Sequence, residues 1–249
     1  MRQDLTKINY LSTTFTYAQI EYCPETTINK VCIGMSSYFP RVATGMLSAI
    51  FLAIPSFWVS AGSAETQVAK APKKLAIFSQ TLNFNLPLDW KLAYTQQQGT
   101  MYSAEFVPAS EALHTWSSML CVQGFKDVAQ DVSPQAFLET MAAVYFERCQ
   151  GETVLESLPS EPLNNHETAS AIIGCTVIPN SHLKSAAAIG TNKVVTQGEI
   201  GHYIVVRGKQ DLYLIHKSIR GEAFTKQNPP IQAHNHQEFL SSITPLSLY

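Results

Sequence analysis

The stretch Glu199–Lys217, EIGHYIVVRGKQDLYLIHK, decides the fold. It holds two strongly β-forming segments, 199–207 and 211–217, joined by Gly208-Lys209-Gln210. So short a connection predicts an antiparallel hairpin. Apolar residues occupy both alternating sets of positions in each segment. Because a strand that is apolar on both faces lies inside a sheet covered on both sides, we expect this hairpin at the centre of the sheet.

The flanking sequence adds strands on both sides and helices between them. Ser133 followed by Pro134, with apolar residues at helical spacing as far as Cys149, predicts a capped helix. Shorter helices are expected over 110–116 and 235–243. Alternation predicts further strands at 75–78, 82–86, 91–94, 101–107, 119–125, 152–158 and 168–178. This order predicts one α+β domain, a mostly antiparallel sheet with helices packed on it.

An export signal precedes that domain. The run Met46–Val59 is uncharged and mostly apolar, Arg41 stands before it, and small residues follow it. A positive end, a short apolar centre and a small-residue cleavage site are the three parts of a secretory signal peptide. We therefore expect a signal peptide over 35–64 and the folded α+β domain over 65–249.

The remaining residues, 1–34, lie upstream of where a signal should begin, and we interpret them as a doubtful extension or a disordered leader. An uncleaved anchor or a buried core helix are the alternatives for the apolar run. It is shorter than the roughly 20 residues that span a bilayer, and it contains Pro55. We therefore predict a periplasmic or secreted protein with no stable membrane span after signal cleavage.

Composition and motifs exclude several classes of function. Charged residues make up 14% of the chain and the formal net charge is −2, so no basic balance suggests a nucleic-acid partner. The sequence contains no G-x-S-x-G, no H-E-x-x-H, no phosphate-binding loop and no dinucleotide fingerprint. We expect no cofactor and no nucleic-acid partner.

Three cysteines follow the predicted signal. Cys149, at the end of a helix, and Cys175, within a strand, are the favoured disulfide pair in an oxidising compartment. Pairing of either residue with Cys121 stays open, because sequence does not fix connectivity. Cys121 lies among apolar residues, which is typical of a buried, inert thiol. A nucleophilic Cys121 would need a nearby histidine, and His114 is the candidate in sequence.

Histidines provide two weaker site candidates. His234 and His236 alternate on one segment, so both rings could bind one metal ion, although further ligands are not apparent. The ordinary interpretation is a polar loop that enters the last helix. His202 and His216 lie on the two strands of the central hairpin and could form an acid–base pair. The ordinary interpretation is that each ring makes a local hydrogen bond on a strand face.

The last third of the chain is rich in basic residues. Arg207, Lys209, Lys217 and Arg220 are candidates for binding an anionic ligand or the carboxylates of a partner protein. The ordinary alternative is a solvated edge of the sheet.

Two segments of the sequence resemble known proteins. One is Leu86-Pro87-x-x-Trp90 with the following Tyr102–Pro108, YSAEFVP, and the other runs from Gly198 to Arg220. Together they resemble a group of uncharacterised exported proteins of Gram-negative bacteria. The order of elements is also similar to PsbP-like α/β/α folds. That likeness implies a small accessory or binding domain, and fold analogy alone assigns no catalytic residue.

Two functions therefore follow as hypotheses. The first is a non-enzymatic exported envelope protein that binds a partner protein or a small ligand. The alternative is a metal- or histidine-dependent, hydrolase-like enzyme of the periplasm.

Overall fold

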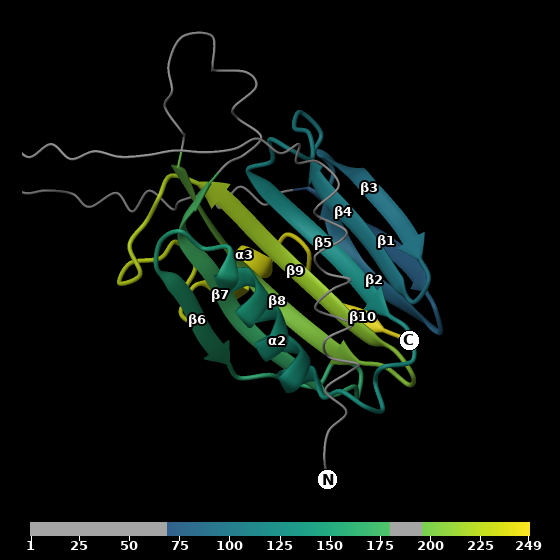
Figure 1. Cartoon of the computed structure of the whole chain (residues 1–249). Coiled ribbons are helices and arrows are strands. Elements are labelled where there is room, and N and C mark those ends of the chain that lie inside the picture. The colour runs from purple at the N-terminus through teal and green to yellow at the C-terminus, as the bar shows by residue number, and fades with distance from the viewer. Residues whose placement is uncertain (1–68, 180–195) are drawn as a thin grey trace, which may run out of the picture.

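The computed structural model describes residues 69–179 and 196–249 (Figure 1). The strands are β1 (Lys70–Ile77), β2 (Gln80–Pro87), β3 (Trp90–Gln98), β4 (Met101–Pro108), β5 (Ser118–Phe125), β6 (Thr153–Leu158), β7 (Thr168–Pro179), β8 (Thr196–Arg207), β9 (Leu212–Gly221) and β10 (Ser247–Leu248). The helices are α2 (Pro134–Glu147) and α3 (His236–Leu240). The predicted leader and signal, 1–34 and 35–64, lie outside the described residues.

The strands form two antiparallel sheets. The large sheet has the order β3-β4-β5-β9-β8-β7-β6, and the small one has the order β1-β2-β10. The predicted hairpin is β8–β9, which pairs from Arg207↔Leu212 to Gly198↔Gly221 and lies near the centre of the large sheet. Both the central hairpin and the α+β class are confirmed.

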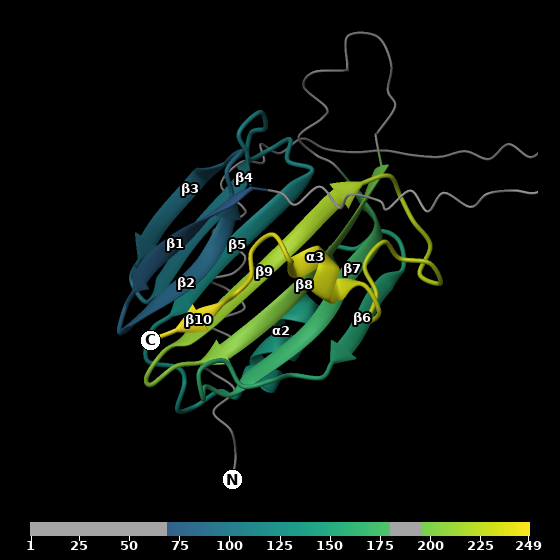
Figure 2. The same cartoon turned by 180° about the vertical axis from the view of Figure 1, so that it is seen from behind.

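The back face of the large sheet is the face seen in Figure 2, covered by the small sheet and the C-terminal segment with α3. The core between this face and the small sheet is apolar and continuous. Phe106, Leu120, Val122 and Ile215 of the large sheet pack there against residues of β2 such as Phe84. Burial of this surface is the main source of stability, at about 25 cal/mol per Å².

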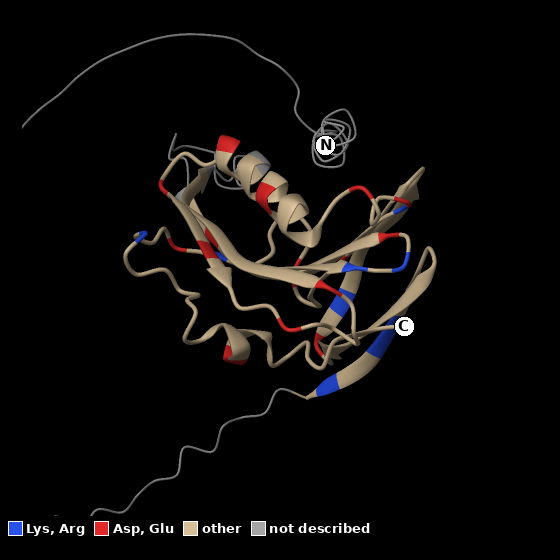
Figure 3. Cartoon of the chain, turned by 90° about the horizontal axis from the view of Figure 1, so that it is seen from below, with Lys and Arg blue, Asp and Glu red and all other residues tan. Residues whose placement is uncertain are grey.

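The front face carries α2, which lies over β7 and β8 (Figures 1 and 3). The helix begins as predicted, because the Ser133 hydroxyl accepts a hydrogen bond from the Ala136 N–H at 3.1 Å and Pro134 occupies the first turn. Phe137 and Leu138 of the helix pack on the sheet. Among the described elements, α2 is the only helix on this face, and it leaves the half formed by β4 and β5 without a helix above it (Figure 1).

Asp211, at the turn of the central hairpin, ties three segments together. Its carboxylate accepts hydrogen bonds from the N–H and hydroxyl of Ser79 (3.1 and 2.5 Å), the N–H of Asp127 (2.9 Å) and the hydroxyl of Tyr213 (3.2 Å). Burial by itself raises the pKa of Asp211, but these hydrogen bonds outweigh it and hold the pKa below its usual value. The ionised carboxylate therefore joins the β1–β2 turn to the large sheet.

Two segments predicted to be helices have a different structure from the one expected. The short helix over 110–116 is wrong: this segment is a series of turns, in which the Glu111 carboxylate accepts hydrogen bonds from the N–H and hydroxyl of Ser117 (2.7 and 2.6 Å). Trp116 is buried against the sheet, so tertiary packing and local side-chain bonds replace helical ones.

The predicted helix over 235–243 is shorter, at His236–Leu240. Downstream of it, the carbonyl of Ile243 accepts from the Asn85 N–H at 2.9 Å and that of Thr244 accepts from the Asn85 side chain at 2.6 Å. The chain leaves the helix to add β10 to the edge of the small sheet, an element that the sequence did not indicate. No helix within 69–179 and 196–249 is long and apolar enough to cross a membrane.

Candidate functional site

A row of polar side chains crosses the front face of the large sheet. Strand register places Glu105 opposite Cys121, Cys121 opposite His216, and His216 opposite Tyr203. Directly paired residues project from the same face of a sheet, so these four side chains form one row. The rings of Tyr203 and His216 stack, with centroids 4.6 Å apart. We call this row, Glu105–Cys121–His216–Tyr203, the polar row.

Further polar residues lie beside the row and are buried. Ser103 is opposite Gln123, next along the same face, and the Ser218 hydroxyl lies 3.1 Å from Nδ1 of His216. Gln123 is only 8% exposed, and its Oε1 atom has no hydrogen-bond partner. Burial raises the pKa of the Glu105 carboxyl, which forms no hydrogen bond or ion pair with the described residues. Two acceptor groups therefore lie on this face without a donor.

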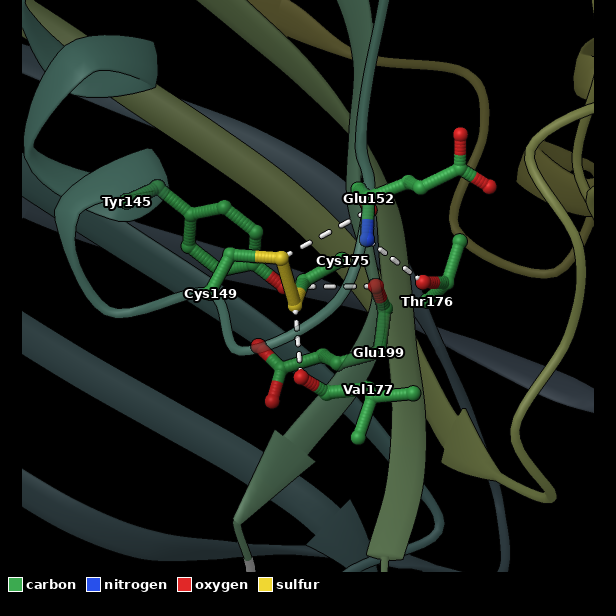
Figure 4. The surroundings of a disulfide bond; sticks show 7 residues. All are labelled: Tyr145, Cys149, Glu152, Cys175, Thr176, Val177 and Glu199. Atoms are coloured by element: carbon green, nitrogen blue, oxygen red, sulfur yellow. Dashed lines mark hydrogen bonds between the residues drawn. A yellow bond between two sulfur atoms is a disulfide. The ribbon is translucent and has the colours of Figure 1, made fainter.

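At one end of the polar row lie an ion pair, a cation–π contact and a hydrogen bond. The Arg220 guanidinium pairs with the Glu199 carboxylate at 2.5 Å and lies over the ring of Trp116, 4.1 Å from its centroid. The Tyr145 hydroxyl of α2 donates to the Glu199 carbonyl at 3.2 Å (Figure 4). These contacts bind α2 and the 109–117 segment to the same end of the sheet.

The disulfide lies beside this group. Cys149, just after α2, is bonded to Cys175 of β7, with 5.5 Å between the Cα atoms, so the pairing favoured from sequence is the one present (Figure 4). In the next turn, the Glu152 N–H donates to the Thr176 hydroxyl at 2.8 Å. The disulfide therefore fixes the end of α2 to the sheet. Cys121 is the free cysteine of the described residues, and it is buried.

The electrostatics of the polar row do not activate a nucleophile. Burial raises the pKa of the Cys121 thiol well above its usual value, the charge of Glu105 raises it further, and a hydrogen bond with Ser103 offsets this only in part. Burial lowers the pKa of His216 to about 4, so its ring is neutral at pH 7. A protonated thiol beside a neutral imidazole lacks the ion-pair setting that makes cysteines reactive. This row is suited to hydrogen bonding.

The structure does not bring the four basic candidates into one site. Arg207 lies at one end of the sheet and pairs with Glu167 at 3.0 Å. Lys209 is exposed in the turn between β8 and β9. Arg220 lies at the far end of β9 in the ion pair described above, and Lys217 projects from the back face. A single anionic-ligand site made from all four is therefore ruled out by their positions.

Lys217 is an internal anchor. Its Nζ donates to the Phe239 carbonyl at 2.5 Å and the Ser242 hydroxyl at 2.8 Å, and it lies 4.3 Å from the centroid of the Phe239 ring. Burial lowers the pKa of Lys217 to about 8. The lysine holds α3 and the following residues against the back face.

The histidines of the central hairpin lie on opposite faces, so His202 and His216 do not form an acid–base pair. Register places His202 opposite Lys217 on the back face, one residue out of phase with the His216–Tyr203 pair. Nε2 of His202 lies 2.5 Å from the Ser170 hydroxyl. The hypothesis of a shared acid–base site is wrong, because successive residues of a strand alternate between faces, and each ring instead has the local hydrogen-bond contact that was the ordinary interpretation.

His234 and His236 are also separated. His236 packs edge-on against His202, with centroids 5.2 Å apart, whereas His234 lies in the exposed loop before α3. Within the described ranges, no three His, Cys, Asp or Glu side chains converge as a metal site. The two rings are therefore not placed to share one ion.

Sequence reasoning missed the neighbours of Cys121. It considered His114, seven residues away, whereas the structure sets His216 opposite Cys121 across β5 and β9. A signal was present: Ser103 and Glu105 in one strand, and Cys121 and Gln123 in another, occupy alternate positions in otherwise apolar segments. Such alternation identifies a polar face. The residues that pair between β5 and β9 are 87 or more positions apart, from Phe125↔Leu212 onward, so a local pattern could not show this pairing.

Comparison with known proteins finds matches among solved structures only. No protein-family model matches the chain, and no curated protein matches its sequence. The crystal structure of the Saccharomyces cerevisiae Ran-binding protein Mog1p is similar at 12% identity, with a TM-score of 0.37; the alignment covers 68% of this chain and 84% of that chain. A TM-score this low supports no inference about this chain's function.

Proposed function

We propose that this protein is a non-enzymatic exported envelope protein that binds a partner protein or a small ligand through the polar row on its front face. The bound group supplies hydrogen-bond donors: an amine, an amide or a guanidinium. This proposal gives a role to the half of the sheet that α2 leaves without a helix.

One observation carries the proposal. The side-chain oxygen of Gln123 is buried without a hydrogen-bond partner, and the partly buried Glu105 carboxylate nearby forms no hydrogen bond or ion pair with the described residues. Leaving a buried polar group unsatisfied costs about 1–3 kcal/mol. A donor-bearing ligand would satisfy both acceptors, because their strands are adjacent and their side chains share one face.

A binding role has more support than the hydrolase-like alternative. Cys121 is held as a thiol, and His216 is stacked on Tyr203 with one ring nitrogen beside Ser218. The remaining histidines, His202, His234 and His236, are divided between the back face and an exposed loop. No described group pairs a nucleophile with an activated base.

Export is supported by two features. The sequence before the domain has the three parts of a signal peptide. The Cys149–Cys175 disulfide fits an oxidising compartment such as the periplasm or the extracellular medium. We therefore propose a periplasmic or secreted location for the mature domain.

The test compares variants of the whole chain, expressed in an exporting bacterium and purified from its envelope and medium. Proteins and small molecules that accompany the wild type are identified by mass spectrometry and then titrated with each variant. Glu105→Gln removes the negative charge and one of the two acceptor oxygens, and Gln123→Leu removes the acceptor of Gln123 altogether. We expect each to weaken binding by about tenfold, the effect of losing roughly 1.4 kcal/mol of hydrogen bonding.

Matched controls are Glu222→Gln and Gln97→Leu, which make the same chemical changes at exposed positions. These should bind as the wild type does. Equal binding by all five proteins would reject the front-face site. Catalytic turnover that disappears on mutation of Cys121 or His216 would reject a non-enzymatic role.

A further inference from the structure

The open edges of the two sheets differ in how they are protected from pairing. Proteins protect edge strands with lysine, proline or a β-bulge, because unpaired backbone groups bind other strands. β1, the edge of the small sheet, carries Lys70, Pro72, Lys73 and Lys74. β3, one edge of the large sheet, has a bulge between Leu92 and Tyr94. β6 forms the other edge of the large sheet (Figures 1 and 2).

β6 has no lysine, proline or bulge, and Glu156 is its one charged residue. Its sequence, TVLESL, lacks lysine and proline, and it pairs with β7 in unbroken register from Thr153↔Cys175 to Leu158↔Ser170. Leu155 at its middle is 49% exposed. A regular strand with an exposed leucine is the kind of edge that accepts another strand.

The hydrogen-bond phase shows which backbone groups of β6 face outward. The Thr176 N–H donates to the Glu152 carbonyl at 2.9 Å, which makes Glu152 and Thr176 a hydrogen-bonded pair. Such pairs recur at every second residue of an antiparallel ladder, so Val154, Glu156 and Leu158 bond to β7. The N–H and C=O groups of Thr153, Leu155 and Ser157 consequently point away from the sheet. Within the described ranges, no loop backbone bonds to them.

We propose that β6 pairs antiparallel with β6 of a second copy of this chain, across a twofold axis at Leu155. The pairing joins two seven-stranded sheets into one continuous sheet. It uses the outer edge of β6 and does not depend on the function proposed for the polar row.

The strand is self-complementary in this arrangement. Leu155 lies opposite the partner's Leu155, and Thr153 lies opposite the partner's Ser157, so that each pair exchanges two backbone hydrogen bonds. The exposed leucines bury each other on the front face. Glu156, the charged residue of the strand, lies opposite the partner's Val154, so like charges are not directly opposed. Isologous contacts of this kind close into a dimer and do not extend.

The helices leave room for the pairing. A twofold axis perpendicular to the sheet places α2 of both copies on the same face. Each α2 lies over β7 and β8, so about four strand spacings, roughly 19 Å, separate the two helix axes. Packed helices are about 8–10 Å apart, so the two copies of α2 do not collide.

Sedimentation equilibrium of the purified protein, expressed from the whole sequence, tests the proposal over a range of concentrations. The wild type should show a reversible monomer–dimer equilibrium. Leu155→Lys should weaken the dimer at least about tenfold, because it places two charges at the twofold axis. Ser157→Pro removes an outward N–H that plays no part in the β6–β7 ladder, and it should also weaken the dimer.

Leu92→Lys is the matched control, since Leu92 lies on the opposite edge and is also 49% exposed. This variant should dimerise as the wild type does. Far-UV circular dichroism confirms that each variant is folded, and Ser157→Pro retains the test if Leu155→Lys is not. A wild type that stays monomeric at every concentration overturns the proposal. This holds even if β6 binds an extended peptide of another protein. A dimer that both β6 variants leave unchanged also overturns it.

Discussion

The two faces of the large sheet are built for different purposes. On the back face, Phe106, Leu120 and Ile215 meet the small sheet in a continuous apolar core. On the front face, the adjacent positions Glu105, Cys121 and His216 are polar, and α2 covers only the β7–β8 half. Burying polar groups without partners costs free energy, whereas burying leucine gains it. The back face therefore supplies stability, whereas the front face carries the polar groups of the proposed binding site.

The largest expected effect on stability comes from truncating, one at a time, two neighbouring residues that lie on opposite faces of the sheet. Leu120 and Cys121 are both buried, at 0% and 2% exposure. Leu120→Ala should reduce the free energy of unfolding by about 4 kcal/mol, through lost apolar burial and a cavity. Cys121→Ala should cost about 1 kcal/mol, because it removes only one side-chain atom, the sulfur. Urea denaturation of the two variants measures the difference, and equal losses would contradict a division of roles between the faces.

The next effect concerns the link between α2 and the sheet on the front face. Replacing both Cys149 and Cys175 by serine removes a cross-link over 26 residues of sequence separation. The unfolded chain gains conformational freedom, so the free energy of unfolding should fall by about 3 kcal/mol. Thermal unfolding under oxidising conditions measures it. The wild type in excess reductant should lose the same amount of free energy of unfolding. If it does not, the loss in the variant comes from the serine side chains and not from the missing disulfide.

Asp211 tests the connection between the two sheets. Asp211→Asn should cost about 2 kcal/mol at pH 7, because an amide cannot accept all the hydrogen bonds that the carboxylate receives. The pKa of Asp211 is lowered in the folded protein, so its stabilisation is complete above the unfolded pKa of about 4 and is lost as pH falls through the folded pKa. The gap between wild type and variant should shrink in acid. A gap that stays constant down to pH 2 would exclude this role.

The sequence predicted the parts of this structure that local pattern determines. The β8–β9 hairpin, the Ser133 cap of α2 and the Cys149–Cys175 pair depend on short segments with strong turn, cap or compartment signals. The prediction of a helix over 110–116 failed because the hydrogen bonds between Glu111 and Ser117 and the burial of Trp116 outweigh helix propensity. β10 and the polar row depend on pairings between residues far apart in the chain, which no local window contains.

The smallest effect compares two histidines, one on each face. The pKa of His202 and that of His216 are both lowered to about 4, by burial in each case and also by His236 for His202. Folded protein therefore resists their protonation: the stability they confer is complete above the unfolded pKa of about 6.5 and is lost as pH falls towards 4. His202→Gln and His216→Gln should each recover about 1 kcal/mol of that acid-induced loss, measured by urea denaturation at pH 7 and pH 5.5. The two recoveries should be similar, because burial together with His236 lowers the pKa of His202 as far as burial alone lowers that of His216. A recovery seen for only one of the two variants would mean that the other ring is open to water, and the face that carries it would then not be sealed.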